Sequence, residues 1–487
     1  MTVQTDIDSL DLQAPPSDAV RGLADKLGER IVLDPEVRAN FVTDFGKVVH
    51  RMPGAIARCK NAEEVAEVVR YCREHKIPVV GRGQGHTQTG QSTTDGGVVI
   101  DTDAMKTIHE INTEELWADC DAGVVWHDLV MTAVPLGYIP PVLTNNLNVT
   151  IAGTTSVAGL GVASYRYGTQ ADNAVEIEVV TGTGEIVTCS LDENRELYDS
   201  VRCGLSQFGI ITRLKTKLRA CKQKIRMYHL LYDDLGDFMK DAEKIMAPDE
   251  RFSSLESRCA PCPIFMKRIG DGLKLREGAQ LYAYWTYPMF LTVEYEEGEE
   301  PNDEALLEGL KYHRHLRTDE YTTLEFCRRL EPVFEIWHNS GNWQMAHPWM
   351  ESVLPWEKAQ EFIEFALDSL PPQTLGPAGH ILLWPSRADT SNAPFFKYPT
   401  TSDFVMGWGI LPAVPHEFLD LALQNLDMVS ELSIGYGGKR YLSGYITFDT
   451  PEKWKNHFGE ETWQLFCEMK KKYDPDGILN PGFITYE

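Results

Sequence analysis

The first half of the chain alternates short apolar runs with segments of helical periodicity. Asn61 is a good helix N-cap residue, and apolar residues between positions 65 and 72 then recur on one helical face. The run 77–80 is apolar and short, as is typical of a buried strand. This pattern predicts alternating strands and helices over residues 55–215.

Two further segments of this half have clear local signals. The run 117–123 is typical of a strand followed by a turn, and 125–134 is typical of a helix. The stretch 175–188 contains β-branched residues on both sides of Thr181-Gly-Thr-Gly184. That combination predicts a β-hairpin.

From about Lys222 the pattern changes to longer helical stretches separated by strands rich in tyrosine and tryptophan. Apolar periodicity predicts helices at 235–245, 303–317 and 356–369. Aromatic-rich apolar runs predict strands at 280–286, 380–384 and 404–408. The second half is therefore expected to form a different kind of domain from the first.

The most informative segment is the glycine-rich stretch Gly81–Gln91, which follows the apolar run 77–80. Three glycines occupy alternate positions from Gly81, and His86 follows them. Glycine lets the backbone approach a ligand closely and adopt positive φ. Successive N–H groups in such a loop can bind an anion, and the pyrophosphate of a dinucleotide is the natural ligand.

The residues after this loop exclude two other nucleotide-binding motifs. The nicotinamide-type fingerprint needs a helix directly after its glycines and an acid about 20 residues further on. Asp101 fits that distance, but 87–97 is polar and glycine-punctuated, and 98–100 is already the next apolar strand. A P-loop needs a Gly-Lys-Ser/Thr sequence, which does not follow here. The loop therefore joins strand to strand; taken alone, it is equally compatible with a surface turn and a structural His86.

Composition narrows the class of protein. The chain has 487 residues, which predicts two or three domains. A net charge of −26 argues against nucleic acid and anionic membranes as partners. No apolar run reaches the roughly 18 residues of a membrane span.

Residues 1–18 predict a disordered tail, not a signal peptide, so a cytoplasmic location is expected. The lone Cys259–Cys262 pair does not predict a metal site.

Together with other segments, the glycine loop carries a resemblance to a known family. Residues 150–161 form a second run rich in small residues, and 478–482 read Ile-Leu-Asn-Pro-Gly. With the loop, these resemble the vanillyl-alcohol oxidase family of PCMH-type FAD-linked oxidases, and within it the cytokinin dehydrogenases. The motifs His347-Pro348-Trp349 and His457-Phe458-Gly459 are similar to motifs of the same enzymes.

The resemblance implies an α+β fold of two parts. The first is a two-lobed PCMH-type FAD-binding domain, expected over residues 19–217. The second is a substrate-binding (cap) domain of antiparallel sheet flanked by helices, expected over 218–440. Residues 441–487 are expected to return to the FAD domain.

The resemblance also implies which residues bind the cofactor. In the cytokinin dehydrogenases the loop histidine is bonded to the flavin 8α-methyl group, so His86 is the expected covalent anchor of FAD. A second link through cysteine, as in the berberine-bridge relatives, is not expected, because 121–188 contains no cysteine. The other residues expected at the cofactor are Arg82, Gly83, Gln84, Gly85, Thr87, Gln91, Asn145, Thr150, Ser156, Leu160, Ile211, Tyr441 and Asn480.

One position departs from the family pattern. Where the cytokinin dehydrogenases carry an aspartate that hydrogen-bonds the substrate amine, this chain has Asn145. An amide can accept a hydrogen bond but cannot take a proton at useful pH. The candidate catalytic residues are therefore Tyr441, in a segment that faces the flavin in the family, and His380, the only histidine of its predicted strand, beside Asn145 itself. A packed tyrosine and a core histidine are the alternatives.

The expected activity is hydride transfer from a small planar or aromatic amine, alcohol or heterocycle to FAD, followed by reoxidation by O2 or another acceptor. Trp343, Trp384 and Trp408 are candidates to line the substrate pocket, although each is also compatible with a place in the core. Two alternative functions stay open: a true cytokinin dehydrogenase, and a catalytically silent flavin-binding protein.

Overall fold

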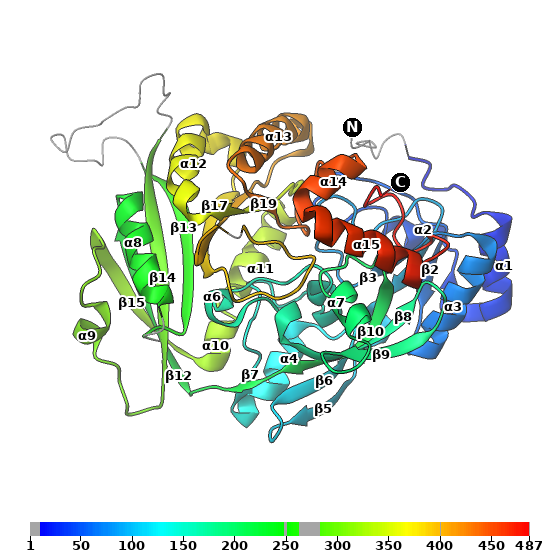
Figure 1. The fold of residues 1–487 in the computed structure, drawn as a ribbon, viewed down its shortest axis with the longest axis horizontal. Coiled ribbons are helices and arrows are strands. Elements are labelled where there is room, and N and C mark those ends of the chain that lie inside the picture. The colour runs from blue at the N-terminus through cyan, green and yellow to red at the C-terminus, as the bar shows by residue number, and fades with distance from the viewer. Residues whose placement is uncertain (1–9, 248–250, 263–282, 400, 487) are drawn as a thin grey trace.

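The structure is a computed structural model that describes residues 10–247, 251–262, 283–399 and 401–486. Figure 1 shows two parts that lie side by side. The N-terminal part, coloured blue to cyan, also carries the red C-terminal helices, and the green-to-orange part forms the other side. This is the α+β, two-domain arrangement that the sequence predicts.

The first lobe of the N-terminal part is a four-stranded sheet in the order β1-β2-β4-β3. Its strands are β1 Ile31–Val32, β2 Ala55–Arg58, β3 Val79–Arg82 and β4 Val98–Asp101. Helices around it are α1 Asp18–Leu27, α2 Pro35–Ala39 and α3 Ala62–His75. Strands β3 and β4 run parallel, and the glycine loop is the connection between them. The predicted strand-to-strand context of this loop is confirmed.

The second lobe is a five-stranded antiparallel sheet in the order β5-β6-β10-β8-β9. Its strands are β5 Ile108–Asn112, β6 Trp117–Asp121, β8 Ala174–Thr181, β9 Ile186–Ser190 and β10 Gly209–Lys217. Its helices are α4 Trp126–Ala133, α5 Ile151–Thr155, α6 Ser164–Tyr167 and α7 Arg195–Val201. Strands β8 and β9 form the hairpin that the sequence predicts, and two short strands, β7 Tyr138–Ile139 and β11 Arg219–Ala220, pair beside the sheet.

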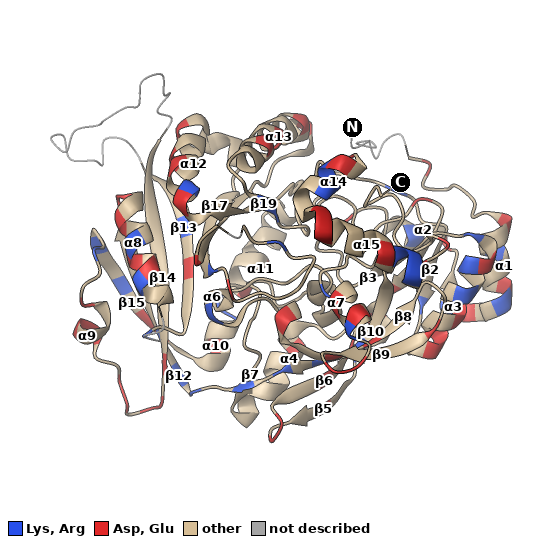
Figure 2. Ribbon diagram, viewed as in Figure 1, with Lys and Arg blue, Asp and Glu red and all other residues tan. Residues whose placement is uncertain are grey.

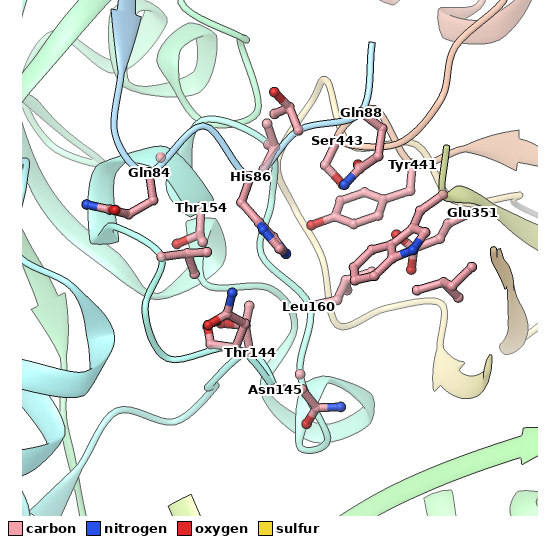
Figure 3. Close-up of a pocket in the computed structure, with 18 of the residues that line it drawn as sticks. Gln84, His86, Gln88, Thr144, Asn145, Thr154, Leu160, Glu351, Tyr441 and Ser443 are labelled. Atoms are coloured by element: carbon pink, nitrogen blue, oxygen red, sulfur yellow. Dashed lines mark hydrogen bonds between the residues drawn. The ribbon is translucent and has the colours of Figure 1, made fainter. Parts of the chain in front are cut away.

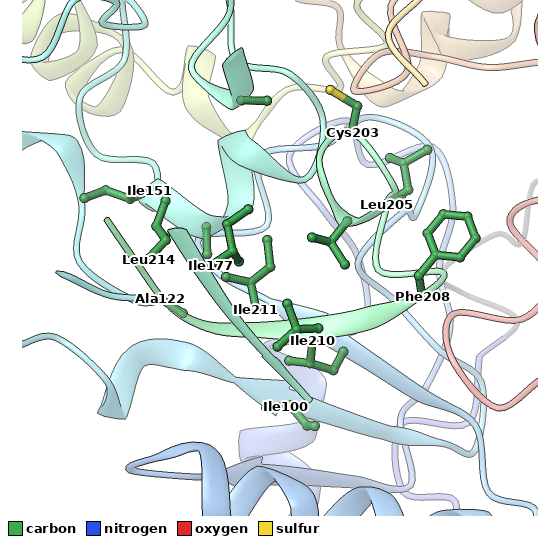
Figure 4. Close-up of a cluster of buried hydrophobic side chains, with 14 of the residues drawn as sticks. Ile100, Ala122, Ile151, Ile177, Cys203, Leu205, Phe208, Ile210, Ile211 and Leu214 are labelled. Atoms are coloured by element: carbon green, nitrogen blue, oxygen red, sulfur yellow. The ribbon is translucent and has the colours of Figure 1, made fainter. Parts of the chain in front are cut away.

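Buried aliphatic side chains join the two lobes (Figure 4). Ile210 and Ile211 on β10 belong to the same buried cluster as Ile100 on β4 and Ile177 on β8. All four are at most 5% exposed. Each such side chain contributes about 1.5–3 kcal/mol to stability when it is fully buried. Strand β10 is therefore held firmly between the two lobes.

The second part is built on an eight-stranded antiparallel sheet in the order β15-β12-β14-β13-β17-β18-β16-β19. Its strands are β12 Lys224–Tyr232, β13 Ser254–Cys262, β14 Tyr284–Tyr295, β15 Arg314–Thr322, β16 Met350–Pro355, β17 His380–Arg387, β18 Phe404–Leu411 and β19 Lys439–Arg440. Its helices are α8 Leu235–Met246, α9 Asp303–Leu307, α10 Thr323–Cys327, α11 Glu331–Asn339, α12 Trp356–Ser369 and α13 Leu419–Gly435. This is the predicted antiparallel sheet flanked by helices.

The predicted helix at 303–317 is wrong over most of its length. Helix α9 ends at Leu307, and Gly309 follows with φ 77°, a left-handed conformation that ends the helical path. Residues from Arg314 onward pair with β12 as the edge strand β15. Pairing with the free edge of β12 is therefore more favourable for this segment than the helix that its weak periodicity predicts.

The predicted tail at 1–18 needs a correction at its end. Residues 1–9 lie outside the described residues. Ser17 and Asp18 begin helix α1, because the Ser17 side chain accepts a hydrogen bond from the Val20 N–H. The Ala14 carbonyl also accepts a hydrogen bond from the Arg38 guanidinium at 2.9 Å. The ordered chain thus starts before the predicted boundary.

The C-terminal segment contacts the two N-terminal lobes directly. Helix α15 Glu460–Tyr473 lies next to α7 in Figure 1, and α14 Pro451–Phe458 packs against α15. Beyond them, the Ile478 carbonyl accepts from the Val79 N–H, and the Asn480 N–H donates to the Val79 carbonyl, both at 2.8 Å. Residues 478–480 therefore pair with strand β3, immediately before the glycine loop.

Lys470 on α15 anchors this segment. Its ammonium forms an ion pair with Asp474 at 2.7 Å and donates to the carbonyls of Gln207 and Leu479, and both charged side chains are at most 2% exposed. We expect Lys470→Met to lower the free energy of unfolding by about 3–5 kcal/mol, because Asp474 would stay buried without its cation. Thermal unfolding followed by circular dichroism measures the loss.

The control for this prediction lies two residues away. Lys472 pairs with Glu196 at the surface, where both side chains are more than half exposed. Surface pairs contribute about 0–1 kcal/mol, so Lys472→Met should leave the melting temperature almost unchanged. Equal effects of the two substitutions would contradict the anchoring role of Lys470.

Residues of both charges are distributed along the outer helices (Figure 2), and the net charge of the chain is −26. Within the described ranges, no helix combines the length and the apolar character that a bilayer crossing needs. Within the same ranges, no group of three or more His, Cys, Asp or Glu side chains could hold a metal ion.

Candidate active site

A cavity of about 510 Å3 lies between the glycine loop and the antiparallel sheet of the second part. This volume is within the range of about 300–1,000 Å3 that small-molecule sites occupy. One wall is the loop Gly81–Gln91 with parts of 144–162 and 205–211. The other wall comes from β13, β16, β17 and α11. Figure 3 shows His86, Tyr441 and Glu351 converging on this space.

Nearly all the residues expected at the cofactor line this cavity. They are Arg82, Gly83, Gln84, Gly85, His86, Thr87, Gln91, Asn145, Thr150, Ser156, Leu160, Ile211 and Tyr441. The structure brings these side chains together from segments far apart in the sequence.

Asn480 is the exception, and its expected role needs correction. It does not line the cavity; it is 2% exposed, and its amide donates to the carbonyls of Gln91 at 3.1 Å and Leu205 at 2.8 Å. Both N–H groups of this side-chain amide are occupied by these two carbonyls. Asn480 therefore supports two segments that line the cavity, and its amide has no free donor for the cofactor.

The glycine loop fits against its neighbours without room for side chains. A Cβ atom on Gly83 would lie 2.2 Å from Thr150 Oγ1, and one on Gly85 would lie 2.5 Å from an Arg82 nitrogen. Gly85 also has φ 64°. These positions need glycine because of both close approach and backbone conformation.

We expect Gly83→Ala to reduce flavin binding on the order of tenfold or more, because the added methyl group pushes the loop away from Thr150. The ratio of flavin to protein after purification measures the effect. Gly435→Ala is the control, since a Cβ there meets no atom within 4 Å. Normal flavin content in Gly83→Ala would show that the loop does not hold the cofactor.

Asp44 holds the glycine loop in place through hydrogen bonds. Its Oδ2 accepts hydrogen bonds from Thr87 Oγ1 at 2.8 Å and from the Gly90 N–H at 2.6 Å. Burial raises the pKa of Asp44 to about 6, and these hydrogen bonds with two nearby arginines limit the rise. The Gln91 side-chain amide donates to the Gly444 carbonyl at 2.8 Å. The Phe45 N–H donates to the Gly85 carbonyl at 2.9 Å, so the loop is fixed on both sides of His86.

His86 points into the cavity (Figure 3). Its ring centroid lies 4.2 Å from that of Phe45 and 5.6 Å from that of Trp349, which stands perpendicular to it. Burial lowers the pKa of His86 to about 4, so the imidazole is neutral at neutral pH. Among the described residues, none hydrogen-bonds the ring. A ring nitrogen lone pair is therefore available for a covalent bond.

Three observations fit FAD at this site. The loop has the close-packed glycines that a pyrophosphate cradle needs. Arg82 lines the cavity and has a buried Nη1 without a partner among the described residues, which suits a phosphate oxygen. Leu205 and Ser206 line the cavity with φ 53° and 59°, a conformation that costs free energy in residues other than glycine and that clusters at functional sites.

Of the three tryptophans predicted for the substrate pocket, only Trp384 lines the cavity. Trp384 lines the cavity, and its ring covers Gly407, where a Cβ would be 1.7 Å away. Trp343 lies behind the wall, 4.9 Å from Phe45. Trp408 is fully buried on the far side of the sheet and packs against Phe362 of α12. The prediction that it lines the pocket is therefore wrong.

Two other tryptophans, which the sequence analysis did not propose, line the cavity. Trp337 on α11 and Trp349, immediately before β16, both line the cavity, and their ring centroids are 6.4 Å apart. Trp349 could have been predicted, because it belongs to the His347-Pro348-Trp349 motif. Trp337 has no such signal, because its helix carries apolar residues on more than one face.

The most important residue that sequence analysis misses is Glu256 on β13. Its carboxylate lines the cavity and accepts hydrogen bonds from Asn145 Nδ2 at 3.3 Å, from Arg258 at 3.0 Å and from Arg329 at 2.9 Å. Arg329 also donates to Asn145 Oδ1 at 2.9 Å. We call Glu256, Asn145, Arg258 and Arg329 the carboxylate cluster.

The charges of the cluster keep Glu256 ionised. Burial alone would raise the pKa of Glu256, but Arg329 and Arg258 outweigh it and lower the pKa to about 2. The fold thus places an ionised carboxylate beside Asn145, from a residue 111 positions away in the sequence. No local motif marks Glu256, so only the fold reveals it.

Tyr441 and His380 both line the cavity, but neither is a strong base. Burial raises the pKa of Tyr441, and its hydroxyl oxygen accepts from the Gly159 N–H at 3.1 Å. The phenol stays protonated and can donate. Burial and the charge of Arg258 lower the pKa of His380 to about 4, and its Nδ1 lies 3.3 Å from the Ala378 carbonyl.

Comparison with known proteins places this geometry in a family. Residues 53–190 match the FAD binding domain, and residues 222–485 match the family described as cytokinin dehydrogenase 1, FAD and cytokinin binding. An uncharacterized oxidoreductase, ORF5 in the fasciation locus of Rhodococcoides fascians, is 32% identical over 441 residues, covering 90% of this chain and 95% of that protein. Cytokinin dehydrogenase 6 of Oryza sativa subsp. japonica is 29% identical over 490 residues, covering 94% and 92%.

The fold and the site thus define an FAD-linked oxidoreductase. The chain belongs to the family of FAD-dependent oxidoreductases of the cytokinin dehydrogenase type.

Proposed function

We propose that this enzyme oxidises a planar aromatic amine at the carbon next to the nitrogen, and that its FAD is bonded to His86 alone. Bound FAD supplies the acceptor for the hydride. The observation that supports an amine is the carboxylate cluster. It places an ionised, buried Glu256 in the cavity, where it can accept a hydrogen bond from a substrate N–H.

The cluster has a clear electrostatic task in this reaction. When a hydride leaves the carbon, positive charge develops on the neighbouring nitrogen of the substrate. Glu256 stabilises that charge, and because its pKa is about 2 it acts as a fixed negative group and not as a proton acceptor. Asn145 and Arg329 hold its carboxylate in place.

The N–H proton of the substrate needs a separate acceptor. His380 lines the same cavity and is neutral, and its Nε2 is free of the contact that Nδ1 makes with the Ala378 carbonyl. We assign the proton to this nitrogen. Trp337, Trp349 and Trp384 supply flat apolar walls for the ring of the substrate.

The relatives' names give the first substrate to test. Several are named cytokinin dehydrogenases, so isopentenyl-adenine, an aromatic secondary amine, leads the panel. The test is anaerobic bleaching of the flavin by matched amines and benzylic alcohols. We expect amines to reduce the flavin about a hundredfold faster, because an alcohol does not develop charge on a nitrogen.

The outcomes of this panel distinguish amine oxidation, cytokinin oxidation and a silent flavin-binding protein. Equal rates with amines and alcohols would overturn the assignment of an amine. Bleaching by benzylic amines without any by isopentenyl-adenine would exclude a cytokinin substrate. No bleaching by any compound would favour a silent flavin-binding protein. Peroxide formation under air tests O2 as the acceptor that reoxidises the flavin.

A further inference from the structure

A second carboxylate, that of Glu351, lies in the cavity and has no part in the proposed reaction. Glu351 is on β16 and lines the cavity on the side of Tyr441, away from Asn145 (Figure 3). The cavity therefore has two acidic groups at two different places, one in the carboxylate cluster and one outside it.

The strand around Glu351 is built to hold its side chain on the cavity side. Gly409 lies directly opposite it on β18, and a Cβ at that position would come within 3.2 Å of Glu351 Cγ. The Glu351 carbonyl accepts from the Tyr441 N–H at 3.0 Å and from Arg440 Nε at 3.2 Å. The backbone is fixed on both sides, while the carboxylate is left free.

The carboxylate itself lacks a partner. Among the described residues, none forms a hydrogen bond or an ion pair with it. Arg440 is the cation that acts on it, but that guanidinium donates to Ser430 Oγ, the Tyr445 carbonyl and the Glu351 backbone. Burial raises the pKa of Glu351 to about 7, and Arg440 lowers it only partly. A half-buried carboxylate without a partner costs free energy that a donor from a ligand would recover.

We propose that Glu351 is a specificity-determining residue that binds a second, cationic or N–H-donating nitrogen group of the substrate. This proposal rests on the proposed amine oxidation and adds the substrate class: planar amines with a second basic nitrogen group at the far end of the ring.

The charges of the cavity favour this place for the second nitrogen. In the carboxylate cluster, the single carboxylate of Glu256 already pairs with two guanidinium groups, so it is less available to a second, permanently cationic group than a carboxylate without a partner. At Glu351 the carboxylate has no such neighbour in hydrogen-bond distance. A cation binding there would pair with an uncompensated acid.

The test is binding to the holoenzyme and uses benzamidine, a planar aromatic cation, with benzamide as its neutral isostere. Changes in the flavin absorption spectrum give both dissociation constants. We expect the wild-type protein to bind benzamidine at least about tenfold more tightly, and Glu351→Gln to reduce this preference to about threefold or less. Glu357→Gln, which removes an exposed acid on α12, is the control and should keep the preference.

Three results would overturn the proposal. One is the absence of a preference in the wild-type protein, including no binding of either compound. Another is an unchanged preference in Glu351→Gln. The third is loss of flavin from Glu351→Gln, which would make Glu351 a cofactor residue. The assay needs no turnover, so its outcome does not depend on whether amines bleach the flavin.

Discussion

Replacing His86 with alanine is expected to release all flavin from the denatured protein. In the wild-type protein, the neutral imidazole of His86 has a free nitrogen in the cavity, and we propose that this nitrogen carries the covalent bond. Denatured wild-type protein should therefore keep its yellow fluorescence on a gel, whereas His86→Ala should show none. Mass spectrometry of the peptide with His86 would show the added mass of FAD.

His380→Ala is the matched control for this experiment. His380 is another cavity-lining histidine whose pKa burial lowers to about 4. It should keep the fluorescent band, although we expect slower turnover. If flavin washes out of denatured wild-type protein, or if His86→Ala retains it, the assignment of the covalent bond to His86 is wrong.

Replacing Glu256 with glutamine is expected to slow flavin reduction by an amine about 10²–10³-fold. Glutamine keeps the shape of the side chain but removes the negative charge that stabilises the developing positive charge of the substrate. It also leaves Arg258 and Arg329 without their anion. Anaerobic stopped-flow measurement with the amine that reduces the wild-type flavin fastest gives the ratio of rates.

Controls separate this effect from misfolding. Glu256→Gln should retain flavin bound through His86, and Glu357→Gln on the surface of α12 should reduce at the wild-type rate. In the wild-type protein, the low pKa of Glu256 means that its ionisation produces no change in rate between about pH 4 and 9, because the carboxylate stays charged throughout. A change of less than fivefold in Glu256→Gln would show that its charge does not stabilise the reaction.

The cofactor loop could be predicted from the sequence because its context is local. Residues 87–97 are polar, contain few helix formers and lead into an apolar run, which is enough to predict that the loop joins two strands. The helix predicted at 303–317 failed because β12 offers a pairing partner that periodicity does not reveal. Local patterns were thus sufficient where local interactions decide the structure.

The substrate side could not be predicted in the same way. Trp384 and Trp408 each follow an apolar run on neighbouring strands, and only the arrangement of helices decides which one faces the cavity. Glu256 meets Arg329, which is 73 residues away, and Asn145, which is 111 residues away. Such a cluster leaves no trace in residue spacing, because no motif connects its members.

The hydrogen bonds of Asn480 bear on the order of events during biosynthesis. Its side chain supports the Gln91 carbonyl across 389 residues of sequence. At about 5–20 residues per second, a ribosome needs roughly 20–80 s to deliver this support after it has made the loop. Cofactor loading is therefore expected to follow the synthesis of residue 480, and nascent chains that end at Tyr473 should carry no flavin.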